Sequence, residues 1–167
     1  MGHHIEALIT RQKPDKEKLL YLDIPLFTEG EFNIIPLDIC HTIYWGKKWN
    51  VYDEYGEHFG GVNLICIQTI ERIAKELGIS DFTIIGTDYH GGIGNQAAIV
   101  YKKSKQAKII GTQLDNKFGL KGVDINSALR AIGVTKQKGI DEFDTINLSN
   151  YRNFDSLYEK YEKYCDD

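Results

Sequence analysis

The stretch FTIIGTDYHGGIGNQAAIVYK, residues 82–102, contains two apolar runs that enclose a polar segment rich in glycine. The runs Phe82–Thr87 and Gln96–Lys102 carry many β-branched and aromatic residues, which is typical of strands. Between them, residues 88–95 supply the glycine and asparagine that a reversal of the chain requires. The sequence therefore predicts two strands joined by a glycine-rich turn.

Further strands are expected on both sides of this hairpin. Residues 4–10 alternate apolar and polar side chains, which is the period of a strand. The runs Phe32–Ile35, Ile39–Trp45 and Ile109–Leu114 also have the composition of strands or extended segments. Residues 46–61 are polar, aromatic and bounded by glycine, and they predict a loop.

Helices are expected where apolar residues recur at intervals of three and four. The clearest is 62–77, which Gly78 would end. A shorter helix is expected over 14–22, where a proline and acidic residues suit the first turn. The same spacing predicts helices over 125–132 and 154–164.

The chain has 167 residues and carries no internal repeat or proline-rich linker, so one domain over residues 1–167 is expected. We predict an α+β fold with a mixed or mainly antiparallel sheet packed against two or three helices. The net charge of −4 argues against general nucleic-acid binding, which requires a basic face. No stretch approaches the ~20 apolar residues of a membrane span.

The cysteine pattern is that of reduced thiols. Cys40, Cys66 and Cys165 are odd in number and widely spaced, and no CxxC motif occurs. This usage is typical of a cytoplasmic protein. Cys40 and Cys66 lie among apolar residues and are expected in the core.

The glycine-rich turn is the first candidate site. Glycines let a ligand approach the main chain, and successive N–H groups in such a turn can form an anion-binding nest. The competing interpretation is a hairpin tip that needs glycine and asparagine for its geometry alone. The candidate ligand-binding residues here are Asp88, Tyr89, His90, Gly91, Gly92, Gly94, Asn95 and Gln96.

Two other groups of residues are candidate functional sites. The aromatic loop 44–59 holds Trp49 with lysines nearby, which suits stacking on a nucleobase, packing beneath a loop or a protein interface. Asp141 and Asp144 form an acidic pair that suits a metal, acid–base chemistry or a solvated loop.

Several known signatures are missing from the sequence. The segment GGIGNQ lacks the dinucleotide-binding spacing, and no Gly-Lys-Ser/Thr follows it as in a phosphate-binding P-loop. The five histidines have no zinc-site spacing, and no serine lies in a nucleophile elbow. We therefore expect no catalytic residue, no metal and no cofactor.

Three blocks occur in order, namely IIGTDYHGGIGNQAAIVY, INSALRAIGV and DEFDTINLSNYR. Together they resemble a family of small, largely uncharacterised bacterial proteins with the motif DY-x-GG-x-G-x-QAA. The likeness covers roughly residues 80–153. His90 departs from the pattern, because related sequences often have an aromatic residue after the tyrosine. The resemblance implies a single-domain fold and carries no settled activity.

The function expected first is non-catalytic binding of a small anionic, nucleotide-like ligand. Arg130 or Arg152 would supply charge, and Tyr89 or Trp49 would cover a base. A phage-type protein that sequesters a nucleotide immune signal fits this description. The second candidate is a protein-binding inhibitor such as a toxin-neutralising immunity protein, and the third is a small hydrolase or nucleotide-processing enzyme. The aromatic loop and the tyrosines of 154–164 also predict a homodimer.

Overall fold

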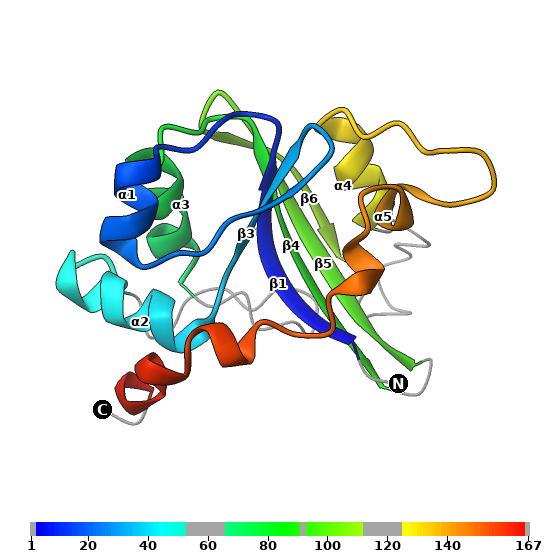
Figure 1. The fold of residues 1–167 in the computed structure, drawn as a ribbon. Helices are drawn as coiled ribbons and strands as arrows, with labels where there is room; N and C mark the ends of the chain where they lie inside the picture. The colour runs from blue at the N-terminus through cyan, green and yellow to red at the C-terminus, as the bar shows by residue number, and fades with distance from the viewer. Residues whose placement is uncertain (1–2, 53–65, 91–92, 112–124, 166–167) are drawn as a thin grey trace, which may run out of the picture.

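The computed structural model describes residues 3–52, 66–90, 93–111 and 125–165. In these residues six strands form one sheet in the order β2-β3-β1-β4-β5-β6, and every neighbouring pair is antiparallel (Figure 1). The predicted α+β class with a mainly antiparallel sheet is therefore confirmed. The strands are β1 (His3–Thr10), β2 (Phe27–Glu29), β3 (Phe32–Pro36), β4 (Phe82–His90), β5 (Ile93–Lys102) and β6 (Lys105–Gly111).

Helices cover both faces of the sheet. On one face α1 (Lys16–Leu22), α2 (Ile39–Lys48) and α3 (Ile67–Glu76) pack against Leu8, Ile84 and Ile99 (Figure 1). On the other face α4 (Ile125–Ala131) and the chain around α5 (Glu142–Thr145) pack against Ile5, Ile85 and Ala98. Successive residues of a strand point to opposite faces, so each strand contributes to both apolar layers.

The extended segment predicted over Ile39–Trp45 is wrong, because these residues belong to α2. The Asp38 side chain accepts a hydrogen bond from the His41 N–H at 2.9 Å and caps the helix. Cys40, Ile43 and Trp45 are buried, so tertiary packing overrides the β-rich composition. The predicted loop 46–61 therefore begins later, and most of it lies outside the described residues.

The predicted helix over 62–77 is confirmed from Ile67, while residues 62–65 lie outside the described part. Ile70, Ile73 and Ala74 are buried as the spacing indicated. The helix expected over 125–132 is α4. The strand expected over 109–114 is confirmed for residues 109–111, which end β6, while residues 112–114 lie outside the described part. No helix among the described residues is long and apolar enough to cross a membrane.

The C-terminal segment differs from the expected continuous helix over 154–164. It forms the short 3-10 turns η2 (Asp155–Leu157) and η3 (Glu159–Tyr164), and Tyr158 and Tyr161 are buried against α2. Cys165 forms a disulfide with Cys40, with a Cα–Cα distance of 5.0 Å. The prediction of three reduced thiols is thus wrong, because the fold brings together two cysteines that are 125 positions apart in the sequence. Cys66 is buried, as predicted, and is not in a disulfide.

Candidate ligand-binding site

The glycine-rich segment is mostly strand. The pairing of β4 with β5 continues to His90 opposite Ile93, so only two residues of the sequence, Gly91 and Gly92, separate the paired strands. These two glycines, and the anion-binding nest expected there, lie outside the described residues. The strands also divide the predicted site, because neighbouring side chains leave opposite faces of the sheet.

Asp88 and His90 lie on the face that carries α2 and α3. The Asp88 carboxylate is 3.1 Å from His90 Nε2 and 3.7 Å from His4 Nδ1. Asn95 pairs with Asp88 across the hairpin. These three predicted residues therefore form a polar row with His4, separate from the pocket described next.

Gly94 is required by the strand pairing. A Cβ atom at this position would collide with the Asp88 carbonyl and would lie 2.6 Å from Tyr89 Cα. The glycine thus permits close approach of β4 to β5, which is a structural reason for its presence.

We expect Gly94→Ala to lower the free energy of unfolding by about 1–3 kcal/mol, because the backbone of β4 must move to admit the methyl group. Thermal denaturation followed by circular dichroism would measure this. Asn95→Ala, at the next position of β5, is the matched control and should have a smaller effect. If Gly94→Ala unfolds at the same temperature as the wild type, the hairpin tolerates a side chain at this position.

Tyr89 and Gln96 line a pocket of about 330 Å³ on the α4 face, which we call the hairpin pocket. β1, β4, β5, α4 and the segment around α5 all contribute to it. Among the proposed ligand-binding residues that the structure describes, Tyr89 and Gln96 alone line it. The other lining residues are His3, Thr87, Ile125, Asn126, Asp141 and Phe143.

Hydrogen bonds hold the polar side chains of the hairpin pocket in place. Gln96 Oε1 accepts a hydrogen bond from the Ile125 N–H at 3.0 Å, which satisfies a donor at the start of α4. Asn126 donates to Asp141 Oδ2 at 3.2 Å and accepts from the Phe143 N–H at 2.9 Å. Asp141 Oδ1 accepts from the Asp144 N–H at 2.9 Å and caps α5. Three distant segments are thereby locked around one cavity.

His3 forms a wall of the pocket in its neutral state. Burial lowers the pKa of His3, the contact with the Leu148 carbonyl opposes this in part, and the positive charge of Arg152 acts in the same direction as burial. His3 Nδ1 lies 2.8 Å from Thr87 Oγ1, and the ring meets Phe143 edge to face at 5.2 Å between centroids. The site therefore presents a fixed, uncharged imidazole beside an aromatic ring.

Tyr89 is half-buried, and its hydroxyl makes no hydrogen bond within the described residues. Asp141 has spare acceptor capacity, since each carboxylate oxygen can accept more than one bond. Both groups can therefore form hydrogen bonds with a ligand in the pocket.

The remaining predicted residues lie apart from this pocket. Arg130 donates to Glu142 at 2.7 Å, and this contact holds the pKa of the Glu142 carboxyl below its usual range. Arg152 is exposed, and its carbonyl accepts the His4 N–H at 2.8 Å, which places it near His3. Trp49 packs on Trp45 at 5.0 Å on the opposite face of the sheet.

Sequence reasoning missed His3, Thr87, Asn126 and Phe143. Alternation along β4 would have grouped Thr87 with Tyr89, whereas His3 and Phe143 come from the two ends of the chain and carry no local signal. Within the described part of the chain, no group of three or more His, Cys, Asp or Glu residues could hold a metal ion.

No protein family, no curated protein and no solved structure matches the chain. The hairpin pocket nevertheless collects one piece of each sequence block that suggested a bacterial family, namely Tyr89 with Gln96, Asn126, and Asp141 with Phe143. Membership of that family stays a prediction.

Proposed function

We propose that the protein binds a small nucleotide-like anion without converting it, with the base in the hairpin pocket. A cavity of about 330 Å³ falls within the range of small-molecule sites. Its aromatic walls, His3 and Phe143, suit a planar ring, and Tyr89 and Asp141 offer hydrogen bonds to the edge of a base. This meeting of rings and polar groups from three segments is the observation that carries the proposal.

The anionic part of the ligand belongs at the rim. Asp141 would repel a phosphate inside the pocket, whereas Arg152 lies close enough to His3 for its charge to act on the imidazole. Arginine grips a phosphate through paired N–H donors. Arg130 is the weaker candidate because Glu142 already neutralises it.

The structural contacts of Asp141 and His3 support binding of a ligand without its conversion. Asp141 serves as a helix cap and His3 is held neutral beside Thr87, so both are positioned by structural contacts. Such an arrangement orients a ligand, and sequestration of a nucleotide signal by a phage-type protein is one role of this kind. The cytoplasm stays the proposed location, although the Cys40–Cys165 disulfide removes the argument from reduced cysteines.

We expect Asp141→Asn to weaken nucleotide binding about tenfold or more, because a hydrogen bond to a charged acceptor contributes about 1.5–3 kcal/mol. Asparagine also caps helices, so the fold should persist. Asp144→Asn, in the same short helix and outside the pocket, is the matched control. Isothermal titration with AMP, GMP and cyclic mononucleotides would measure the affinities.

The bound molecule should be recovered intact after incubation and denaturation of the protein. A cleaved nucleotide would make the protein an enzyme. Equal binding to the Asp141→Asn and Asp144→Asn variants would place the ligand elsewhere, and no binding by any of the proteins would favour a protein partner.

A protein-binding role is the second candidate, because α1 exposes two large apolar side chains. Leu20 is 83% exposed and Tyr21 is 59% exposed, and Lys48 lies over the Tyr21 ring. Aromatic residues are enriched at the centres of protein interfaces. A toxin-neutralising inhibitor or a homodimer would use this patch, whereas the tyrosines of the C-terminal segment are largely packed against α2.

A further inference from the structure

A small cavity lies between β1, the link from β3 to α2, and η2. It has a volume of about 130 Å³. Three acidic residues and a histidine form its polar lining, namely Glu6, Asp38, Asp155 and His4. We call it the acidic cavity, and no lysine or arginine belongs to the lining that the structure describes.

The acidic side chains form the part of the wall that a ligand can reach. Glu6 and Asp38 are partly exposed, and Asp155 is exposed. The apolar lining residues Leu37 and Phe154 are only 4% exposed, so they pack behind the polar groups. A molecule in the cavity would therefore meet carboxylates before any apolar surface.

Glu6 is the acid in this wall that lacks a partner. Its carboxyl group is almost completely surrounded by protein, yet it forms no hydrogen bond or ion pair with any described residue. Buried glutamates are normally paired, because an unsatisfied polar group is costly to bury. Burial raises the pKa of Glu6, and the negative charges of Asp38, Asp155 and Asp88 raise it further.

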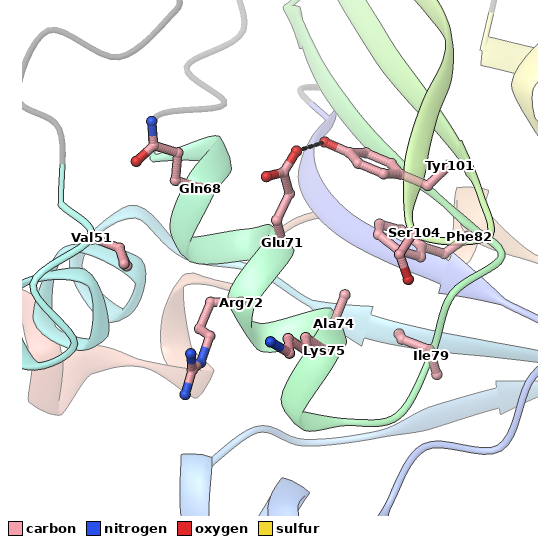
Figure 2. Close-up of a pocket in the computed structure, with 10 residues that line it drawn as sticks. All are labelled: Val51, Gln68, Glu71, Arg72, Ala74, Lys75, Ile79, Phe82, Tyr101 and Ser104. Atoms are coloured by element: carbon pink, nitrogen blue, oxygen red, sulfur yellow. Dashed lines mark hydrogen bonds between the residues drawn. The ribbon is translucent and has the colours of Figure 1, made fainter.

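The charged groups beside α3, on the same face of the sheet, show the usual pairing. Figure 2 shows Glu71 turned towards Tyr101, and Glu71 Oε1 accepts a hydrogen bond from the Tyr101 hydroxyl at 2.8 Å. Arg72 forms an ion pair with Glu76 at 2.8 Å. Glu6 differs from these two acids because no described residue of the protein supplies its partner.

We infer that the acidic cavity is a binding site for a guanidinium or ammonium group, which Glu6, Asp38 and Asp155 would bind together. Ionised carboxylates accept strong hydrogen bonds from the N–H donors of such cations. Asp38 Oδ1 already accepts the His41 N–H, but a carboxylate oxygen can accept more than one bond. The cavity has several times the volume of a water molecule, so it can admit a head group of this kind.

An organic cation fits better than a metal ion. Within the described part of the chain, no group of three or more His, Cys, Asp or Glu residues could hold a metal. The carboxylates of the acidic cavity therefore suit a cation that presents several N–H donors in different directions.

The inference does not depend on nucleotide binding in the hairpin pocket. Glu6 and His3 lie three positions apart on β1, so their side chains leave opposite faces of the sheet. No described residue lines both cavities.

NMR titration of the isotope-labelled protein with methylguanidinium and its neutral counterpart methylurea tests the inference. The wild type should bind methylguanidinium about tenfold more tightly than methylurea, because hydrogen bonds between charged groups are the stronger. Glu6→Gln and Asp155→Asn should each weaken methylguanidinium binding several-fold. Glutamine keeps the shape of the Glu6 side chain and Asp155 is exposed, so circular dichroism should show an unchanged fold.

The pH dependence of binding isolates the part played by Glu6. Wild-type affinity for methylguanidinium should rise about tenfold between pH 6.5 and 8.5, since Glu6 must release its proton to meet the cation. The other titratable groups that face Glu6 are Asp38, Asp155, Asp88 and His4, and all four remain in Glu6→Gln. The variant should therefore lose most of the rise.

Glu159→Gln, which removes an exposed carboxylate outside the cavity, is the control and should bind methylguanidinium as the wild type does. Tighter binding of the peptide acetyl-Gly-Arg-Gly-amide than of methylguanidinium would identify a partner's arginine as the source of the head group, and weaker binding would identify a free cation. Four results would overturn the inference: no binding of methylguanidinium, equal affinity for methylguanidinium and methylurea, unchanged affinity in both Glu6→Gln and Asp155→Asn, or the full rise with pH in Glu6→Gln.

Discussion

Replacing Cys165 with serine is expected to lower the free energy of unfolding by about 2–4 kcal/mol, because it removes the disulfide with Cys40. The bond joins residues 125 apart, and closing so long a loop restricts the unfolded chain strongly. The C-terminal segment keeps other contacts, since the Tyr158 hydroxyl donates to the Pro36 carbonyl at 2.7 Å and Tyr161 packs on Tyr44. We therefore expect a folded but less stable protein.

Urea denaturation with and without dithiothreitol measures this effect. The reductant should bring the wild type to the stability of Cys165→Ser and should leave the variant unchanged. Cys165 is exposed, so the serine itself should cost little. If dithiothreitol leaves the urea midpoint of the wild type unchanged, the disulfide contributes nothing to stability.

The strands were readable from the sequence because their signal is local. The alternation of β1 and the two runs around the glycines predicted the centre of the sheet correctly. The prediction over residues 39–45 was wrong because isoleucine, tyrosine and tryptophan favour strands, whereas the Asp38 cap and the burial of most residues in this segment favour a helix. The cap was visible in the sequence, but the burial that decides the outcome was not.

The site was less readable because it depends on long-range contacts. The predicted cluster treated adjacent residues as neighbours, yet the pleat sends Asp88 and Tyr89 to opposite faces. His3 reaches the hairpin pocket through strand pairing, and Asp141 reaches it through its bond with Asn126. Neither contact leaves a spacing in the sequence.

A small acidic cavity between β1 and the C-terminal segment sets the largest pH effect that we expect. It has a volume of about 130 Å³, and the carboxylates of Glu6, Asp38 and Asp155 line it with His4. Burial, and then the charges of Asp38, Asp155 and Asp88, raise the pKa of Glu6 to about 8. Glu6 is thus held protonated at neutral pH in the folded protein.

The direction of the effect follows from proton linkage. An unfolded glutamate has a pKa of 4.5, so between pH 4.5 and about 8 the folded state binds more protons and stability falls as the pH rises. His41 acts oppositely, because burial lowers its pKa from 6.5 to about 4 and stability rises across that range. The two contributions largely cancel below pH 6.5, and the Glu6 contribution alone remains above it.

We expect the wild type to lose about 2 kcal/mol of stability between pH 6.5 and 8.5, since one unit of pKa corresponds to about 1.4 kcal/mol. Glu6→Gln keeps the shape of the side chain and removes its titration, so its stability should rise to pH 6.5 and then stay level. Glu159→Gln, which removes an exposed carboxylate from η3, should follow the wild type. Urea denaturation at pH steps from 4 to 9 gives all three curves. If Glu6→Gln loses stability above pH 6.5 as steeply as the wild type does, then another group titrates there and Glu6 is ionised in the folded protein.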